Sequence, residues 1–430
     1  MLRKRIYVSV LFINLLFFAF IANVDAAENN LSFIPGAEER FRVEYRDNFT
    51  FNKQTDDEGY LAFQRLLING KLTYKQDLIL FIEGNDIREI SCNTKKTSQY
   101  DDLDLYQGYM EYKNGLIGIK IGRQQLDYGD KRLLAAPSWS NKLKSFDAIK
   151  TYLCCENTSL DLFTGHIVLY DDNNPNEMDN SEYVYGSHIS YKNKNLFIPN
   201  IEFMYLTIYD EDKVIKGEDN RYGELNQHTI DTLIKGSLFS SGIDYAFEFA
   251  YQFGKYGTND IKNAYAIHAD IARKFNCFLL PELKLEYNNA SGDKSPSDFK
   301  TNTFIPYYQT THDPYGLMDF FIWQNMREIA LSVKLNPNKK VSMTPALNFF
   351  WLDEKRDSWY KSSGSKIRTA SNSDVSYFVG IETSVVIKYN LNKNVKLETG
   401  YAHFFSSIYV KDTGAHADVN WMYVQTKINF

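Results

Sequence analysis

The sequence predicts a single antiparallel β-barrel of about 18 strands that crosses a membrane. Three observations support this prediction: an export signal at the N-terminus, a two-residue alternation of apolar and charged side chains, and a regular exchange of short and long polar links. After residue 27, no apolar run approaches the roughly 20 residues that a transmembrane helix needs. The mean hydropathy of -0.40 suits a barrel, because barrel strands are apolar on one face only.

The N-terminus has the pattern of a secretory signal peptide. A basic stretch at 3–5 precedes an apolar run at 6–22, and Val24-Asp25-Ala26 fits a small-residue cleavage site. A retained membrane anchor is the alternative, because the run approaches the length that spans a bilayer. The predicted organisation is, in order, a cleaved signal peptide at 1–26, a short N-terminal segment at 27–37 and the barrel at 38–430.

The strongest strand pattern lies at 243–253. Isoleucine, tyrosine or phenylalanine occupies every odd position there, and Asp244, Glu248 and Gln252 fall between them. A strand places the two sets on opposite faces, whereas a helix would scatter both around its circumference. A large soluble β-protein would show the same period, so the links between strands must discriminate. The period recurs at 41–45, 283–287 and 329–335, and it is weakest at 146–153 and 229–238.

The polar links alternate between short and long along the chain. Short links are expected at 75–77, 113–115, 156–158, 192–195, 240–242, 274–278, 336–340 and 390–394. Long links are expected at 51–59, 91–102, 126–146, 171–182, 211–226, 254–262, 289–325, 353–374 and 406–418. Bacterial outer-membrane barrels have short periplasmic turns and long extracellular loops, so the pattern predicts that location, with both ends of the barrel in the periplasm. The 289–325 link is long enough to fold into the mouth.

The last ten residues, WMYVQTKINF, alternate strictly and end on an apolar aromatic residue. Met422 and Val424 are expected to face lipid, with Gln425 and Lys427 facing the lumen. A soluble edge strand could share this pattern, but the signal peptide and the link pattern favour a closing barrel strand that pairs with the strand near 40–46. Phe430 is then the expected assembly signal, and the expected partners are the barrel-assembly machinery, the lipid bilayer and lipopolysaccharide.

Composition and motifs argue against several other functions. The formal net charge of -6 excludes a strongly basic nucleic-acid-binding protein. Four cysteines are too few for a disulfide framework, and any pairing among Cys92, Cys154, Cys155 and Cys277 stays open. The sequence has no zinc-type Cys/His spacing, phosphate-binding glycine loop or Ser/His/Asp set, so we expect no metal, no cofactor and no enzymatic activity.

Several longer motifs resemble a known family. They are DLYQGYMEY at 104–112, IGRQQLDYGDKRLLAAPSWSN at 121–141, FDAIK at 146–150, and GYAHFF and VNWMYVQTKINF within the last residues, 400–430. Together they resemble the alginate export porins over essentially the whole mature chain. The resemblance implies an 18-stranded outer-membrane barrel and a channel for an anionic polysaccharide. It also implies that basic residues line the pore.

Seven basic residues are the candidates for the pore lining and for anion binding. Arg40, Arg42 and Arg46 share the polar face of one strand with Glu44, and a pore that selects anions needs such cations. Arg123 is out of phase with the lumen unless its strand bends or ends there. The other candidates are Arg65, Lys120 and Arg132. The alternative is a structural role, in which the arginines pair with lumen carboxylates at Glu44, Glu83, Asp127 and Asp130.

The sequence therefore predicts a passive outer-membrane channel for an anionic sugar or polysaccharide such as alginate. A general porin for small solutes and a closed surface-binding or adhesin barrel are the alternatives. Export and uptake are not distinguished, because a passive pore has no intrinsic direction. The solute, gating by a loop and the oligomeric state also stay open.

Overall fold

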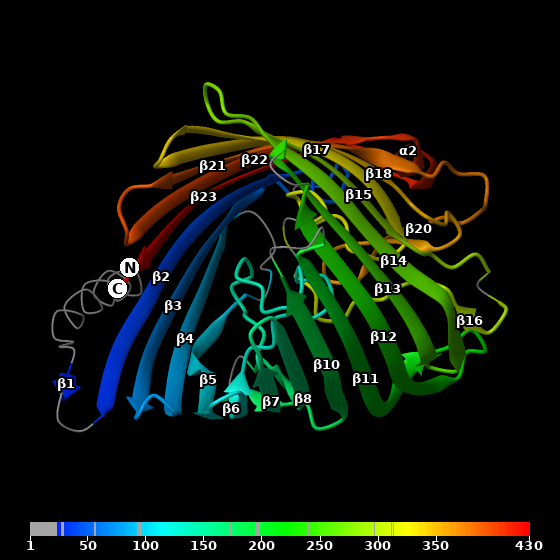
Figure 1. The fold of residues 1–430 in the computed structure, drawn as a ribbon. Coiled ribbons are helices and arrows are strands. Elements are labelled where there is room, and N and C mark those ends of the chain that lie inside the picture. The colour runs from blue at the N-terminus through cyan, green and yellow to red at the C-terminus, as the bar shows by residue number, and fades with distance from the viewer. Residues whose placement is uncertain are drawn as a thin grey trace, which may run out of the picture.

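The computed structural model describes residues 24–26, 30–55, 57–92, 97, 99–171, 174–193, 198–238, 241–295, 297–310, 312 and 314–430. The predicted signal peptide lies outside these ranges except at 24–26. Within them the chain forms a closed barrel of 18 antiparallel strands, as the sequence predicts (Figure 1). Among the described residues, no helix has the length and apolar character to cross a membrane.

The wall strands follow one another around the barrel in chain order. They are β2 (Leu31–Asp47), β3 (Gly59–Tyr74), β4 (Leu78–Cys92), β5 (Asp101–Asn114), β6 (Ile117–Gln124), β7 (Phe146–Cys154), β8 (Thr158–Leu169), β10 (Glu182–Lys192), β11 (Asn200–Lys216), β12 (Tyr222–Ser237), β13 (Ile243–Tyr256), β14 (Asn259–Lys274), β15 (Glu282–Ala290), β17 (Met326–Asn338), β18 (Val341–Trp351), β21 (Phe378–Asn390), β22 (Val395–Ser406) and β23 (Val419–Asn429). Short elements flank them: β1 (Val24–Ala26), β9 (Glu177–Met178), β16 (Lys300–Thr301), β19 (Ser358–Tyr360), β20 (Lys366–Thr369) and α2 (Ile408–Thr413).

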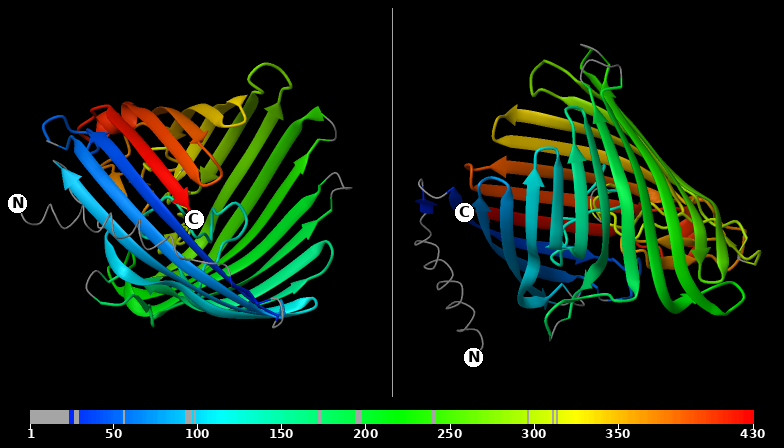
Figure 2. Two further views of the ribbon diagram at one scale, coloured as in Figure 1. Left: turned by 90° about the vertical axis from the view of Figure 1, so that its left-hand side faces the viewer. Right: turned by 60° about the horizontal axis from the view of Figure 1, so that its bottom comes forward.

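The first and last wall strands close the barrel. β2 pairs with β3 on one side and with β23 on the other (Figure 2). Arg40 stands opposite Lys427 in the β2–β23 register. Met422 and Val424 are exposed on the outer face, whereas Trp421 and Tyr423 are buried on the inner face. The predicted pairing and orientation of the closing strand are therefore present in the structure.

Three boundaries differ from the sequence prediction. β2 begins at Leu31 rather than at 38, because Pro35-Gly36 does not interrupt its ladder with β3. The expected long link at 254–262 is mostly strand, since only a turn at 257–258 joins β13 to β14. The expected link at 211–226 shrinks in the same way to 217–221. Strands that project beyond the bilayer meet water on both faces, so polar residues do not mark their ends.

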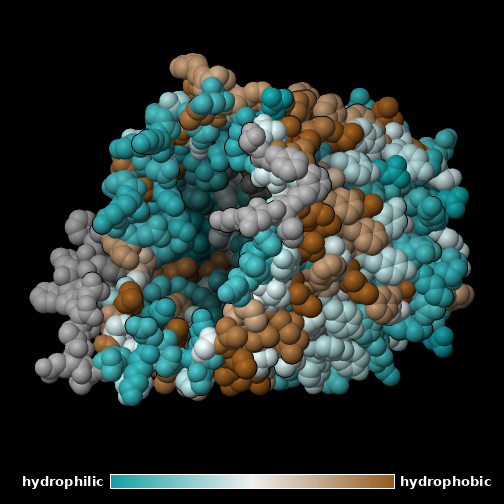
Figure 3. Space-filling model, viewed as in Figure 1, coloured by the Kyte–Doolittle hydropathy of each residue, from teal (hydrophilic) through white to brown (hydrophobic). Residues whose placement is uncertain are grey.

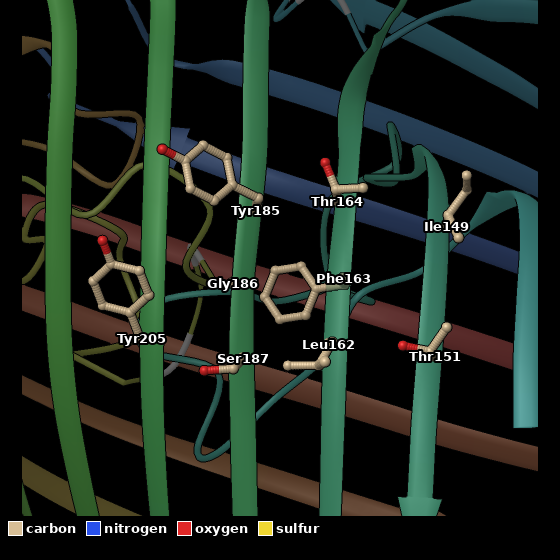
Figure 4. Close-up of a pocket in the computed structure, with 9 residues that line it drawn as sticks. All are labelled: Ile149, Thr151, Leu162, Phe163, Thr164, Tyr185, Gly186, Ser187 and Tyr205. Carbon is tan, nitrogen blue, oxygen red and sulfur yellow. The ribbon is translucent and has the colours of Figure 1, made fainter. Parts of the chain in front are cut away.

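The two faces of the wall differ in polarity. On β13, Phe247 and Phe249 are about two-fifths exposed on the outer face, whereas Glu248 and Gln252 are almost fully buried on the inner face. Figure 4 shows part of the outer wall, where side chains from β7, β8, β10 and β11 line a shallow groove of about 400 Å³. The alternation predicted at 243–253 is thus the lipid-side and lumen-side alternation of a barrel wall.

Two long loops fold into the barrel and fill much of its interior. The 125–145 loop and the 291–325 loop contact each other through Ala135, whose N–H donates to the Tyr308 carbonyl at 2.9 Å. Apolar side chains of the inward loops and the wall pack into one cluster, which includes Phe51, Phe304, Phe320, Phe321, Trp323, Trp359 and Phe404. The length of the 289–325 segment allowed it to fold over the mouth or into it, and the structure has it folded inward.

Candidate functional site

Three arginines on the inner faces of β2 and β3 form what we call the arginine cluster: Arg40, Arg42 and Arg65. Each is at most 3% exposed, and Arg40 stands directly opposite Arg65 in the β2–β3 register. Like charges directly opposite in a sheet repel each other, so this pair needs compensation from other groups.

Most of the compensation comes from the 125–145 loop. Arg40 donates to the carbonyls of Ser138 and Trp139 at 2.6 and 2.8 Å. It also donates to the Ser140 carbonyl at 3.3 Å and to Asn141 Oδ1 at 2.5 Å. Arg42 donates to the Trp139 carbonyl at 2.7 Å. Arg65 donates to the carbonyls of Ser138 and Ser140 at 3.0 and 2.8 Å. The cluster therefore holds this loop across the lumen.

Carboxylates neutralise only part of the arginine cluster. Arg42 pairs with Glu44 at 2.8 Å, and Arg65 pairs with Glu38 at 2.9 Å. Arg40 has no carboxylate partner among the described residues, and its Nε has no hydrogen-bond partner there. A buried cation that contacts only neutral acceptors keeps much of its unfavourable desolvation, so positive charge remains uncompensated at Arg40.

A cavity of about 230 Å³ adjoins the arginine cluster. Four cations line it, Arg40, Arg65, Lys388 and Lys427, together with the carboxylate of Glu398. The other lining residues are Ser138, Trp139, Thr310, His312, Leu317, Val386, Tyr423 and Gln425. Lys388 and Glu398 flank the short turn at 391–394, so the cavity opens toward the short-turn end of the barrel. Figure 3 shows a deep hollow in the molecule with hydrophilic residues around it.

Aromatic residues form the inner boundary of this cavity. The Trp139 ring stacks on the His312 ring, with the two ring centroids 3.7 Å apart. The guanidinium of Arg42, from β2, lies 3.8 Å from the centroid of the same Trp139 ring. His312 Nδ1 lies 2.9 Å from Asp319 Oδ1, and burial raises the pKa of that carboxyl. Trp139 thus joins the arginine cluster to the 291–325 loop.

The opposite part of the lumen carries the reverse charge. We call Glu202, Glu248, Glu286 and Glu328 the carboxylate wall; they lie on the inner faces of β11, β13, β15 and β17. Arg132 of the 125–145 loop reaches this wall and contacts Glu248 at 3.2 Å and Glu286 at 3.5 Å. One loop therefore contacts both the basic and the acidic sides of the lumen.

A family model for alginate export matches residues 31–422. The chain belongs to the alginate export family. No curated protein sequence matches it.

Solved structures share the fold at low sequence identity. Acinetobacter baumannii OccAB1 is 14% identical with a TM-score of 0.61, covering 92% of this chain and 96% of that one. Pseudomonas aeruginosa OccK5 (OpdH) is 12% identical with a TM-score of 0.59, covering 93% and 98%. The outer membrane protein opdK from Pseudomonas aeruginosa is 9% identical with a TM-score of 0.60, covering 92% and 99%. At such identities, the similarity establishes an outer-membrane type of barrel and nothing about the solute.

In this alginate export barrel, the seven predicted basic residues do not form one patch. Arg40, Arg42 and Arg65 lie together, and Arg46 extends the group by donating to Glu44 at 2.8 Å. Lys120 lies on β6 with its ammonium 3.6 Å from the Tyr109 ring centroid. Arg132 lies at the carboxylate wall, because its loop crosses the lumen.

Arg123 is the clearest departure from the predicted pore lining. It shares the outward phase of Ile117 and Ile121, which are exposed, and it pairs with Asp147 at 2.9 Å. It also donates to the Asn176 carbonyl at 3.0 Å, so it joins β6 and β7 to the 170–181 loop. Arg123 therefore keeps its outward phase, and the strand does not turn its side chain toward the lumen.

The predicted carboxylate partners are only partly as expected. Glu44 pairs with Arg42 and Arg46, but Glu83 accepts from the amides of Asn69 and Gln107. Asp127 and Asp130 pair with lysines, Lys131 and Lys235. The arginines instead use Glu38, Asp147, Glu248 and Glu286. These contacts depend on the register between strands and on the depth of the loop, which one sequence does not reveal.

Sequence reasoning missed several residues of the cavity. Trp139 was part of the quoted family motif, but nothing in its spacing indicated a position over Arg42. No sequence pattern indicated that His312 or Lys388 lines the cavity. The lumen phase of Lys388 follows from the alternation along β21 once the bounds of that strand are known. The predicted lumen positions of Gln425 and Lys427 are present in the cavity.

Proposed function

We propose that this member of the alginate export family is a passive outer-membrane channel for an anionic sugar or polysaccharide such as alginate. The observation that supports it most directly is the excess of cations in the cavity beside the arginine cluster. Cations that line a narrow, low-dielectric passage lower the free energy of an anion inside it. The proposal includes no catalytic step, and passage follows the concentration gradient in either direction.

Ion selectivity in planar bilayers tests this proposal. We expect the purified protein to conduct with a preference for anions, and a Lys388→Gln/Lys427→Gln double variant to lose most of that preference. These lysines are suitable because they line the cavity without holding the 125–145 loop. A cation preference, or an anion preference that the double variant leaves unchanged, contradicts the proposal. Permeation that depends on solute size but not on charge supports a general porin instead.

A closed binding barrel is the second candidate, because two inward loops and an apolar cluster occupy the lumen. It predicts no conductance, but binding of a surface ligand by the long loops. The same bilayer recording separates the two functions, since a closed barrel gives no current in any salt.

We also propose that Phe430 is part of the signal for barrel assembly, with the bilayer and lipopolysaccharide as the surroundings of the folded wall. Its side chain is 54% exposed, while its backbone N–H donates to the Ala37 carbonyl at 2.9 Å. Deleting Phe430 removes one backbone bond but also the terminal aromatic ring. We expect a large loss of folded protein in outer-membrane fractions, whereas Phe430→Tyr is expected to assemble normally. Normal assembly after the deletion contradicts the proposal.

A further inference from the structure

The cavity beside the arginine cluster is small, although four cations line it. Its volume of about 230 Å³ falls below the roughly 300–1,000 Å³ of pockets for drug-sized ligands. Trp139, His312 and Leu317 bound it toward the long-loop end. The space therefore suits one small solute and is too small for several residues of a polymer strand.

The boundary of the cavity is firmly held. Seven hydrogen bonds join the arginine cluster to the 138–141 segment. On the other side, the Glu382 carboxylate accepts from the backbone N–H groups of Leu317 and Met318 at 2.5 and 3.3 Å. Both inward loops are thus anchored to the wall next to the cavity.

The charges of the cavity call for an anion. Four cations line it, and two carboxylates oppose them: Glu398 lines the cavity, and Glu38 binds Arg65 and Lys427. Arg40 is 2% exposed, has only neutral partners among the described residues and keeps an unbonded Nε. A carboxylate is a stronger acceptor for a guanidinium than a carbonyl, because both partners then carry charge.

The neutral groups of the cavity call for hydroxyl donors. Gln425 Oε1 is buried and has no donor among the described residues. A simple inorganic anion such as chloride brings no donor, whereas a sugar acid brings several hydroxyl groups. The ring centroids of Trp139 and Tyr423 lie 4.9 Å apart in an edge-to-face arrangement beside these polar groups, and the two rings limit the space that the carbon skeleton of the solute can occupy.

Exposure falls from the mouth of the cavity to its inner end. The side chain of Lys388 is 57% exposed, that of Lys427 is 33% exposed, and that of Arg65 is 2% exposed. An anion arriving from the short-turn end meets the flexible lysines first and the fixed guanidinium groups last. This order favours capture of one solute at a time.

We propose that this cavity is a saturable binding site for a single sugar acid, a monosaccharide-sized solute with one carboxylate and several hydroxyl groups. The proposal rests on the anion channel proposed above and narrows its substrate to the monomer. In it, Arg40 and the two lysines bind the carboxylate, Gln425 accepts from a hydroxyl group, and Trp139 and Tyr423 bound the space that the sugar occupies.

Calorimetric titration of the purified full-length barrel in detergent tests this site, with glucuronate, glucose, sulfate and a uronate trisaccharide as probes. We expect saturable 1:1 binding of glucuronate, at least tenfold weaker binding of glucose, and no tighter binding of the trisaccharide. Lys388→Met/Lys427→Met is expected to weaken glucuronate binding at least tenfold. The matched control Lys255→Met/Lys274→Met removes two lysines that pair with Asp260 and Asp244 away from the cavity, and it is expected to change nothing.

A second variant separates the sugar acid from an inorganic anion. Gln425→Leu is expected to weaken glucuronate binding several-fold while sulfate binding stays unchanged. Equal loss for both anions, tighter binding of the trisaccharide, or no glucuronate binding overturns the proposal.

Bilayer recording on the same preparation keeps the two proposals apart. Anion-selective current without glucuronate binding refutes the monomer site and leaves the channel standing. Glucuronate binding without any current refutes the channel and leaves the site standing.

Discussion

The arginine cluster and the carboxylate wall solve the same problem of buried charge in different ways. In the cluster, the guanidinium groups of Arg40 and Arg65 are bound mainly by loop carbonyls, which carry no net charge. At the wall, Glu248 depends on one cation, Arg132. Glu328 accepts instead from the amides of Asn288 and Asn348 at 2.8 and 2.6 Å. The two regions therefore differ in the number of hydrogen-bond or ion-pair partners that each buried charged group has.

This difference determines what each region tolerates. The Trp139 carbonyl accepts from both Arg40 and Arg42, and the carbonyls of Ser138 and Ser140 each accept from Arg40 and Arg65. Loss of one cluster arginine therefore leaves no backbone carbonyl of the loop without a donor, although loss of Arg40 removes the donor to Asn141 Oδ1. Loss of Arg132 leaves the Glu248 carboxylate buried without an ion-pair partner among the described residues. Where two arginines share each carbonyl acceptor, one arginine can leave that acceptor to bind a solute while the other keeps the acceptor bonded.

The largest expected effect is that of Arg132→Met. Removing one partner of a buried ion pair costs about 3–5 kcal/mol, because the remaining charge stays buried. We expect a loss of that size in the free energy of unfolding, measured by denaturant titration of the barrel in detergent with tryptophan fluorescence. Arg132→Lys keeps a cation near Glu248 and is expected to recover part of the loss.

Arg40→Met is the matched substitution in the arginine cluster. Its expected cost is about 1–3 kcal/mol, because every backbone carbonyl keeps another donor but the buried Asn141 Oδ1 loses its own. Removing Arg40 also relieves the repulsion between Arg40 and Arg65. If Arg40→Met and Arg132→Met lowered the free energy of unfolding by the same amount, the two regions would not differ in how well they tolerate the loss of one arginine.

The sequence alone predicted the barrel because its signals are local. The alternation on 243–253 and the closing strand near the C-terminus are each determined within a few residues, and the structure has both. The polar stretches at 211–226 and 254–262 predict loops but are mostly strand, because beyond the bilayer both faces of a strand meet water. The predicted fold class is correct in spite of these errors in strand boundaries.

The candidate site was harder to predict because its contacts join distant segments. Arg40 meets Ser138 across 98 positions of the chain, and Arg132 meets Glu248 and Glu286 only because its loop spans the lumen. Alternation gave the inward phase of Arg40, Arg42 and Arg65 correctly. It could not show that loop carbonyls, rather than Glu83 or Asp130, would be their partners.

The smallest expected effect concerns Lys144, near the end of the same loop. Its Nζ donates to the Gln309 carbonyl at 2.9 Å, and burial lowers the pKa of the ammonium from 10.5 to about 8. The unfolded chain therefore binds more protons than the folded barrel between about pH 8 and pH 10.5, so stability rises with pH across that window. Below pH 8, the buried ammonium destabilises the fold in full.

Lys144→Met is expected to remove this pH dependence. The variant should be slightly more stable than the natural protein at pH 7, and the gain should shrink as the pH rises through the 8 to 10.5 window. Denaturant titrations at pH 7, 9 and 10.5 measure it, with Lys274→Met as the control because Lys274 is exposed and paired with Asp244. A gain that is the same at every pH would mean that packing of the methionine, rather than the buried charge, sets the stability of the loop at Lys144.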